Sequence, residues 1–174
     1  MEPLPLVAQY SAINGMVTED FDGDGNLDIC MNTNDYGTDP SNGRYDALNG
    51  LILKGDGKGR FTPLSILQSG IFIPGNGKAL VKLRNSSGKC LLAASQNKGP
   101  LKIFQLKASY KTISLNSLDV SAIISYKDGR HQKREIGYGS SFLSQSGRFL
   151  NIDDNVISIE IKNNKRESRK VNMQ

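Results

Sequence analysis

Apolar residues along this chain occur in short alternating or continuous runs, such as NGLILKG (49–55), KGPLKIFQL (98–106) and NVISIEIK (155–162). Asn-Gly, Asp-Gly and Gly-Lys-Gly sequences separate these runs, and such residues are typical of tight turns between strands. No stretch has the 3.6-residue periodicity of a helix of useful length. The pattern therefore predicts an all-β fold.

The first part of the chain contains a repeat. Residues 14–34 align with residues 77–97, and another apolar stretch follows each copy. The first copy also carries an insertion, DYGTDPSNGRYDA (35–47), and ends in a predicted hairpin, GDGKGRFTPL (55–64). Repeats of short strands at this spacing are typical of β-propeller blades, and two blades cannot close a ring. We therefore expect residues 1–106 to be the last blades of a β-propeller, and the chain to be the C-terminal piece of a longer protein.

The composition changes after this region. Ten basic and ten acidic residues lie up to residue 105, whereas twelve basic and seven acidic residues follow, so the second part carries the net charge of +5. Segments 120–139 and 155–172 each predict a hairpin, around Lys-Asp-Gly-Arg and Asn-Asn respectively. We expect residues 107–174 to form a small antiparallel β-domain with a different surface.

The sequence DFDGDGNLD (20–28) concentrates four carboxylates in nine residues. Like charges at this spacing repel one another unless a cation lies among them, and Gly23 and Gly25 allow the tight backbone that a wrapped ion requires. Calcium accepts six to eight oxygen ligands in irregular geometry, which makes it a better candidate than magnesium. The predicted ligands are Asp20, Asp22, Asp24, Asp28 and the backbone carbonyl of Asn26.

An EF-hand does not account for this loop. Its twelfth position requires a bidentate Glu and its flanks are helices, whereas Met31 stands there and the flanks are strand-like. In the second copy of the repeat, the ligand positions hold Leu83, Asn85, Ser87 and Leu91. That copy is therefore expected to bind no metal, and the ion in the first copy is expected to brace a loop rather than to catalyse a reaction.

The acidic loop, the repeat and residues 128–152 resemble segments of known protein families. The sequence DFDGDGNLD, with the strand and hairpin that follow it, resembles the FG-GAP or VCBS repeat of integrin-type β-propellers, in which the matching loop binds calcium. The second copy resembles a degenerate repeat of this type. Residues 128–152, DGRHQKREIGYGSSFLSQSGRFLNI, are similar to the ASPIC/UnbV segment that typically ends exported proteins with such repeats.

The resemblance implies an exported, non-enzymatic protein at the cell surface, in the periplasm or outside the cell. The sequence MEPLPLVAQY (1–10) lacks the basic and long apolar regions of a signal peptide, and no apolar run is long enough to span a bilayer. We expect the partners to be a glycan or a protein, together with the remaining propeller blades of the parent chain. The insertion is the candidate ligand-binding loop, because Tyr36, Asp39, Arg44, Tyr45 and Asp46 offer aromatic and planar polar groups suited to sugars; the alternative is a surface loop of ordinary turn residues.

Two alternatives use other residues. A polysaccharide-acting hydrolase requires a pair of carboxylates, and Asp39 and Asp46 are the one plausible pair outside the acidic loop. A nucleic-acid-binding module would use the basic runs KDGRHQKRE and KNNKRESRK of the C-terminal part, but acidic residues interrupt both runs and neither contains interleaved aromatic residues.

For the remaining reactive side chains, the sequence predicts structural roles. Cys30 and Cys90 lie in apolar runs and are expected to be buried and unpaired. His131 is the single histidine and is expected on a strand surface. The serines of SSFLSQS (140–146) have no recognisable base, so we expect their hydroxyls to bond backbone groups in a turn. The apolar residues of this region, Phe142, Leu143 and Phe149, are expected to fill a core.

Overall fold

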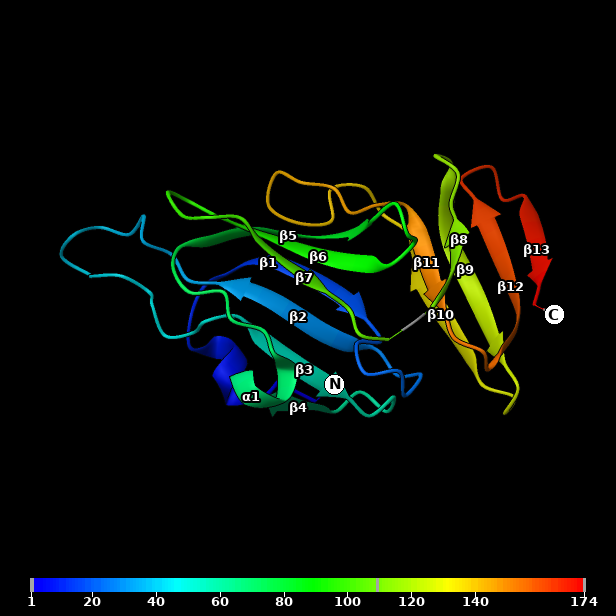
Figure 1. Ribbon diagram of the computed structural model, residues 1–174, viewed down its shortest axis with the longest axis horizontal. Helices are drawn as coiled ribbons and strands as arrows, with labels where there is room; N and C mark the ends of the chain where they lie inside the picture. The colour runs from blue at the N-terminus through cyan, green and yellow to red at the C-terminus, as the bar shows by residue number, and fades with distance from the viewer. Residues whose placement is uncertain (1, 109, 174) are drawn as a thin grey trace. The chain divides into compact units, whose positions relative to one another are not determined.

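The computed structural model describes residues 2–108 and 110–173. It consists of antiparallel β-sheets with two short helical turns, η1 (Leu6–Gln9) and α1 (Ile66–Ser69), which confirms the predicted all-β fold (Figure 1). The chain divides into two compact units, residues 1–108 with 139–147, and residues 109–138 with 148–174. Among the described residues, no helix has the length and apolarity needed to cross a membrane.

The first unit contains two sheets. The first sheet has the strand order β1-β2-β3-β4, and the second sheet has the order β5-β6-β7, so each is built from sequential antiparallel neighbours. The strands of the two sheets are β1 (Ile13–Glu19), β2 (Asp28–Thr33), β3 (Leu51–Gly55), β4 (Phe61–Leu64), β5 (Gly77–Arg84), β6 (Cys90–Gln96) and β7 (Lys102–Gln105). The predicted hairpin at residues 55–64 is formed by β3 and β4.

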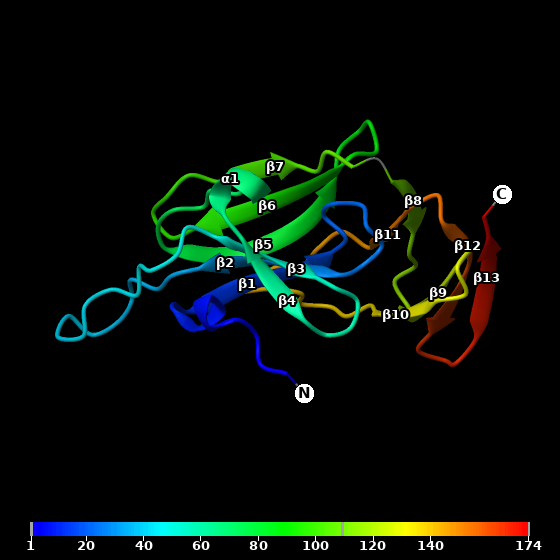
Figure 2. The ribbon, with the colours of Figure 1, turned by 90° about the horizontal axis from the view of Figure 1, so that it is seen from below.

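The two sheets contact each other mainly through β1, β2 and β5 (Figures 1 and 2). A Cβ atom on Gly15 would lie 2.5 Å from the backbone nitrogen of Leu80, so glycine allows the close approach of β1 and β5. The amide of Asn32 then donates to the carbonyl oxygens of Ala79 and Ser95, each at 2.9 Å. Partly buried backbone carbonyls of the second sheet thus find donors on the first sheet.

The segment before β1 forms a turn rather than a strand. PLPLVAQ (3–9) has the pattern of the end of a strand, but it forms the 3-10 turn η1, in which the Ala8 amide donates to the Pro5 carbonyl at 2.9 Å. Ala8 is buried with Met31 and Leu53 in the core of the first sheet. Apolar residues here cover a sheet face instead of pairing along its edge.

The second unit packs a four-stranded sheet, β10-β9-β12-β13, against the pair β8–β11. The predicted hairpins around Lys-Asp-Gly-Arg and Asn-Asn are β9–β10 and β12–β13. Ile124 and Ile159 from the large sheet and Leu150 and Ile152 from β11 share one core. The strands are β8 (Lys111–Ser114), β9 (Asp119–Tyr126), β10 (His131–Glu135), β11 (Phe149–Ile152), β12 (Val156–Asn163) and β13 (Ser168–Asn172).

Segment 139–147 leaves the second unit and belongs to the first. Its hydroxyls bond the backbone of β5: the Leu80 amide donates to Ser141 Oγ and the Lys82 amide donates to Ser146 Oγ, each at 3.0 Å. The serines therefore satisfy strand β5 as well as their own turn, where the Ser146 amide donates to Ser140 Oγ at 2.9 Å.

The apolar residues of this region divide into two groups. The prediction that Phe142 and Leu143 fill a core is wrong, because they are 47% and 93% exposed, whereas Phe149 is buried as predicted. The hydroxyl contacts hold segment 139–147 along the edge of β5, and its two large apolar side chains project outward from there.

Candidate metal-binding loop and neighbouring sites

The acidic loop, residues 20–27, joins β1 to β2 within the first sheet. Its shape comes from carboxylates that accept backbone N–H groups. Asp20 accepts from Gly23 at 2.7 Å and from Gly25 at 2.9 Å, and Asp24 accepts from Asn26 at 2.8 Å. Gly23 and Gly25 have φ values of +84° and +83°, a region in which a side chain would be strained. The glycines thus permit the tight backbone that the sequence predicts.

Three carboxylates converge in this loop. Asp20, Asp22 and Asp28 each offer an oxygen, and these oxygens lie within 4.8 Å of one another. Asp20 and Asp28 are buried and Asp22 is exposed. Asp24 lies beside Lys54, whose Nζ is 3.1 Å from its carboxylate and also bonds the Asp22 carboxylate. Lys54 therefore neutralises charge on the exposed carboxylates of Asp22 and Asp24. The charge of the buried carboxylates, Asp20 and Asp28, is left to other groups.

The β3–β4 hairpin supports the loop from one side. Asp28 accepts the Gly55 amide at 2.9 Å and the Phe21 amide at 3.0 Å. A Cβ atom on Gly55 would lie 2.1 Å from the Leu27 carbonyl oxygen, and one on Gly57 would lie 2.4 Å from Asn26 Oδ1. The sequence analysis missed Lys54, Gly55 and Gly57 as neighbours of the loop. The Gly-Asp-Gly-Lys-Gly turn was the signal, since glycines at alternate positions allow close backbone approach.

The buried carboxylates are poorly solvated. Burial raises the pKa of Asp20 above its ordinary value, against the hydrogen bonds from Gly25 and Gly23 that lower it. Burial likewise raises the pKa of Asp28. Burial alone would also raise the pKa of Asp24, but hydrogen bonds from Asn26 and Lys54 bring it below the ordinary value. A cation between Asp20 and Asp28 would favour their ionised forms.

The donor set fits a hard cation. Carboxylate oxygens are the ligands that Ca²⁺ prefers, and the loop adds backbone carbonyls at residues such as Asn26 within a flexible turn. All three converging carboxylates accept backbone amides, Asp22 from Asp24 at 3.2 Å, as metal-ligating carboxylates commonly do. The arrangement has three carboxylates together with Asp24 alongside, and the five-ligand set stays a prediction.

The corresponding positions of the second sheet hold no acidic cluster among the described residues. Leu83 and Leu91 lie opposite each other in the β5–β6 ladder, and Asn85 and Ser87 lie in the turn between those strands. This turn is shorter than the acidic loop, because β5 extends to Arg84 and β6 begins at Cys90. The position of Asp20, a loop residue in the first sheet, is therefore a strand residue, Leu83, in the second, whereas Asn85 and Ser87 stay in the turn.

The insertion projects from the sheets as a long loop (Figure 1, cyan). Arg44 stacks on Tyr36, with the guanidinium carbon 4.8 Å from the ring centroid. A hydrogen bond to the Asp46 carboxylate raises the pKa of Tyr36. Tyr45 pairs with Asp35 through the backbone, and Asp39 accepts the Ser41 amide at 2.8 Å. The structure thus brings Tyr36, Arg44 and Asp46 together, whereas Asp39 stabilises its own turn.

Asn34 anchors the base of the insertion, and the sequence analysis missed it. Its side chain is fully buried and donates to Asp46 Oδ1 at 3.1 Å and to the Gly75 carbonyl at 3.1 Å, and also to the Leu48 carbonyl. Its φ of +79° is uncommon for a residue with a side chain. A buried asparagine that follows a strand and precedes an insertion was the available signal.

The hydrolase hypothesis gains no support from Asp39. Hydrogen bonds from the Ser41 hydroxyl and amide lower the pKa of Asp39, whereas a general acid for glycoside hydrolysis needs a raised pKa. His131 lies on β10, exposed, with Nδ1 3.1 Å from the Ser125 hydroxyl. Cys30 and Cys90 are buried, as predicted, and neither forms a disulfide in the part of the chain that the structure describes; burial raises the pKa of Cys30 to about 12.

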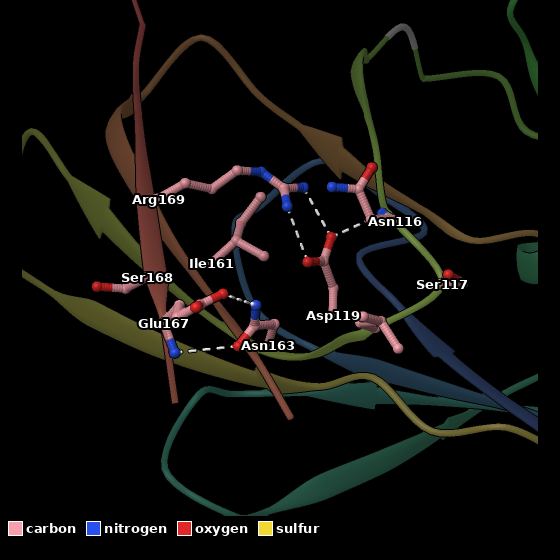
Figure 3. Close-up of a pocket in the computed structure, with 9 residues that line it drawn as sticks. Asn116, Ser117, Asp119, Ile161, Asn163, Glu167, Ser168 and Arg169 are labelled. Atoms are coloured by element: carbon pink, nitrogen blue, oxygen red, sulfur yellow. Dashed lines mark hydrogen bonds and ion pairs between the residues drawn. The ribbon is translucent and has the colours of Figure 1, made fainter. Parts of the chain in front are cut away.

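A polar pocket of about 300 Å³ lies in the second unit, between the start of β9 and the β12–β13 hairpin (Figure 3). Asp119 is 2% exposed and forms a two-point ion pair with Arg169, at 2.8 and 2.7 Å. It also accepts the Asn116 amide at 2.7 Å. The carboxylate thus ties the start of β9 to β13 and to the turn before β9, so the pocket wall is a structural ion pair.

The basic hairpins of the second unit are partly neutralised. Arg130 pairs with Asp128 at 2.6 Å and Lys133 pairs with Glu135 at 2.5 Å. Such pairs lower the positive charge that a phosphate backbone would meet.

Comparison with known proteins adds no relative: no protein-family model matches the chain, and a search of curated proteins finds no match.

Proposed function

We propose that this chain is part of a calcium-stabilised, non-enzymatic binding or scaffolding module of an exported or cell-surface protein. The observation that carries the proposal is the convergence of Asp20, Asp22 and Asp28, two of them buried and held by backbone amides. The calcium ion would be held by these residues together with Asp24 and the Asn26 carbonyl. It would supply positive charge and cross-link the loop, which fixes the end of the β1–β2 hairpin.

The FG-GAP or VCBS resemblance belongs to the same proposal. Two tandem sheets with the same sequential strand order, from segments that repeat in the sequence, support their interpretation as propeller blades. On this interpretation the second unit, with segment 139–147, is the ASPIC/UnbV-like part. The partner is a glycan or a protein that contacts the insertion, where Tyr36, Arg44 and Asp46 present a stacked aromatic and two charges.

The first test is thermal unfolding with calcium, with magnesium and with excess chelator. Ligand at 100 times its Kd stabilises a folded protein by about 2.7 kcal/mol, which is several degrees in Tm. We expect this rise with calcium, a smaller one with magnesium, and greater protease sensitivity of residues 15–35 in chelator. The Asp22→Asn variant should lose most of the calcium response, because it removes one of the three converging carboxylates. Because Asp22 is exposed, the substitution should leave the fold intact.

The matched control is Asp56→Asn, which changes a carboxylate in the β3–β4 turn that caps the amides of Lys58 and Arg60. This variant should keep the full calcium response. Equal Tm values in calcium and chelator for the unmodified chain would contradict the proposal. So would an equal loss of the response in both variants.

A further inference from the structure

The chain contains four Asn-Gly pairs, at residues 14–15, 42–43, 49–50 and 76–77. Asparagine before glycine is prone to spontaneous deamidation, which begins when the glycine nitrogen attacks Cγ of the asparagine side chain. In a folded protein this requires a glycine N–H outside hydrogen bonds, a side-chain amide that is free to turn, and a backbone that can rotate. Glycine itself favours the rotation, because it has no Cβ. The structure places the four pairs in different surroundings.

Two of the pairs are held where the two sheets of the first unit meet. The side-chain amide of Asn14 donates to the carbonyls of Asn34 and Gly77, each at 3.0 Å, so it is not free to turn. Asn76 is 6% exposed, and the Gly77 amide donates to the Gly75 carbonyl at 3.0 Å. Each of these pairs therefore lacks a free group that the reaction needs.

The pair at 49–50 is exposed at its asparagine but has a fixed backbone. The Asn49 carbonyl accepts the Ile73 amide at 2.8 Å. A Cβ atom on Gly50 would lie 3.2 Å from the side chains of Ile71 and Ile73. Because this peptide is attached to the segment that passes over it, its rotation is restricted.

The pair at 42–43 lies in the insertion, which projects from the sheets (Figure 1), and both of its residues are exposed. Within the part of the chain that the structure describes, neither the Asn42 side-chain amide nor the Gly43 N–H forms a hydrogen bond. Gly43 has a φ of +72°, and no atom lies within 4 Å of the position of its Cβ. The Asn42 N–H donates to the Asp39 carbonyl at 2.9 Å, which leaves both reacting groups free.

We propose that Asn42 is a site of spontaneous deamidation, at which the insertion acquires a carboxylate. The Gly43 nitrogen loses its proton to solvent base and bonds Asn42 Cγ. The bond from Cγ to Nδ2 breaks, ammonia leaves, and a cyclic succinimide results. Water then adds to either carbonyl of this ring and opens it to aspartate or isoaspartate, without any oxidant or reductant.

The modification changes the insertion but not its attachment. Both products add a negative charge close to Arg44, and isoaspartate also passes the main chain through Cγ, which lengthens it. The backbones of Asp35 and Tyr45 bond each other at 3.0 Å in both directions at the base of the insertion. These bonds lie outside the modified peptide, so the sheets should stay intact.

The test is incubation of the full chain at pH 8 in water enriched in ¹⁸O, followed by peptide mapping with mass spectrometry. Heavy oxygen should enter at Asn42 at least tenfold faster than at Asn49, and Asn14 and Asn76 should stay intact. In urea sufficient to unfold the chain, the rates at all four pairs should become similar, because the protection comes from the fold. Equal rates at Asn42 and Asn49 in the folded chain, or the same ranking in urea, would overturn the proposal.

A variant pair tests the role of the glycine. Gly43→Ala should slow deamidation of Asn42 at least tenfold, because a side chain shields the attacking nitrogen and restricts the rotation that glycine allows. Gly59→Ala is the matched control, since Gly59 also has a positive φ, of +90°, and no atom within 4 Å of its Cβ position. It should leave the rate at Asn42 unchanged. An unchanged rate in the Gly43→Ala variant would contradict attack by this nitrogen.

Discussion

The first and second sheets solve the same structural problem with different residues. In the second sheet, one asparagine closes the β5–β6 turn: Asn85 Oδ1 accepts the Lys89 amide at 2.9 Å, and the backbones of the same two residues bond at 3.0 Å. In the first sheet, the equivalent connection is longer and contains Asp20, Asp22 and Asp24. The β5–β6 hairpin thus closes without a carboxylate, whereas the carboxylates of the first sheet shape a longer loop and three of them also converge.

The same comparison holds at the other end of the hairpin. Asn34 and Asn97 are equivalent in the sequence repeat. Asn34 is fully buried and donates to oxygen atoms of Asp46, Leu48 and Gly75. Asn97 is exposed, and its backbone amide donates to the Asn76 carbonyl at 2.9 Å. The first copy has an insertion to anchor and the second has none. The identity of a residue is thus conserved between the copies here while its structural role is not.

The largest expected effect is on this pair of asparagines. Asn34→Ala removes hydrogen bonds to buried carbonyls and places alanine at a φ of +79°, so we expect a loss of about 3 kcal/mol in the free energy of unfolding. Asn97→Ala should change it by less than about 0.5 kcal/mol, as at most surface positions. Urea denaturation of the two variants measures the difference.

A third variant separates the two causes. Asn34→Gly keeps the positive φ without strain and still loses the side-chain hydrogen bonds, so it should be about 1 kcal/mol more stable than Asn34→Ala. Similar losses for Asn34→Ala and Asn97→Ala would mean that the two positions are equivalent in energy, against the comparison drawn from their contacts.

Local patterns in the sequence account for most of the strands. Tight-turn residues and short apolar runs predict the hairpins, because both signals act between neighbouring residues. Contacts between distant segments were not predictable in this way. The binding of Ser141 and Ser146 to the edge of β5 depends on where the chain returns, and no local pattern encodes that. For the same reason Phe142 and Leu143 were placed in a core although they are exposed.

The candidate site follows the same division. The spacing within residues 20–28 is local, and it predicts the carboxylates that converge there. Lys54 and Gly55 reach the loop from another hairpin, through an ion pair and a hydrogen bond to Asp28. The sequence indicates the turn in which they lie and leaves its position against the loop open.

The second prediction compares Asp119, whose counter-ion is Arg169, with the carboxylates of the acidic loop, whose proposed counter-ion is calcium. Asp119 of the second unit has an internal cation: although burial alone would raise its pKa, hydrogen bonds from Arg169 and Asn116 lower it below the ordinary value. A lowered folded-state pKa contributes stability above the unfolded pKa of about 3.8, and this contribution is lost as the pH falls from about 4 through the lower folded value.

Asp119→Asn should therefore destabilise the second unit by about 2 kcal/mol at pH 7, between the values for exposed and buried pairs, because Arg169 is partly exposed. The loss should shrink as the pH falls below 4. Denaturation of both chains between pH 7 and pH 3 measures it, and Asp128→Asn, which changes an exposed pair, is the control. A destabilisation that stays constant over this range would contradict the assigned ion pair.

The smallest expected effect tests whether Lys54 competes with the proposed calcium ion. Its ammonium group lies beside Asp22 and Asp24, and hydrogen bonds to both carboxylates raise its pKa, so it stays charged at neutral pH. Two unit charges near a protein surface interact by about 1 to 4 kcal/mol at 4 Å, and solvent exposure favours the lower figure. Lys54→Met should therefore raise calcium affinity about fivefold while lowering the Tm in chelator.

Calorimetric titration measures the affinity, and Lys58→Met in the β3–β4 turn, which removes a lysine from the same hairpin, should leave it unchanged. Weaker calcium binding by Lys54→Met would mean that the lysine orients the carboxylates for the ion, and that the first sheet depends on both cations together.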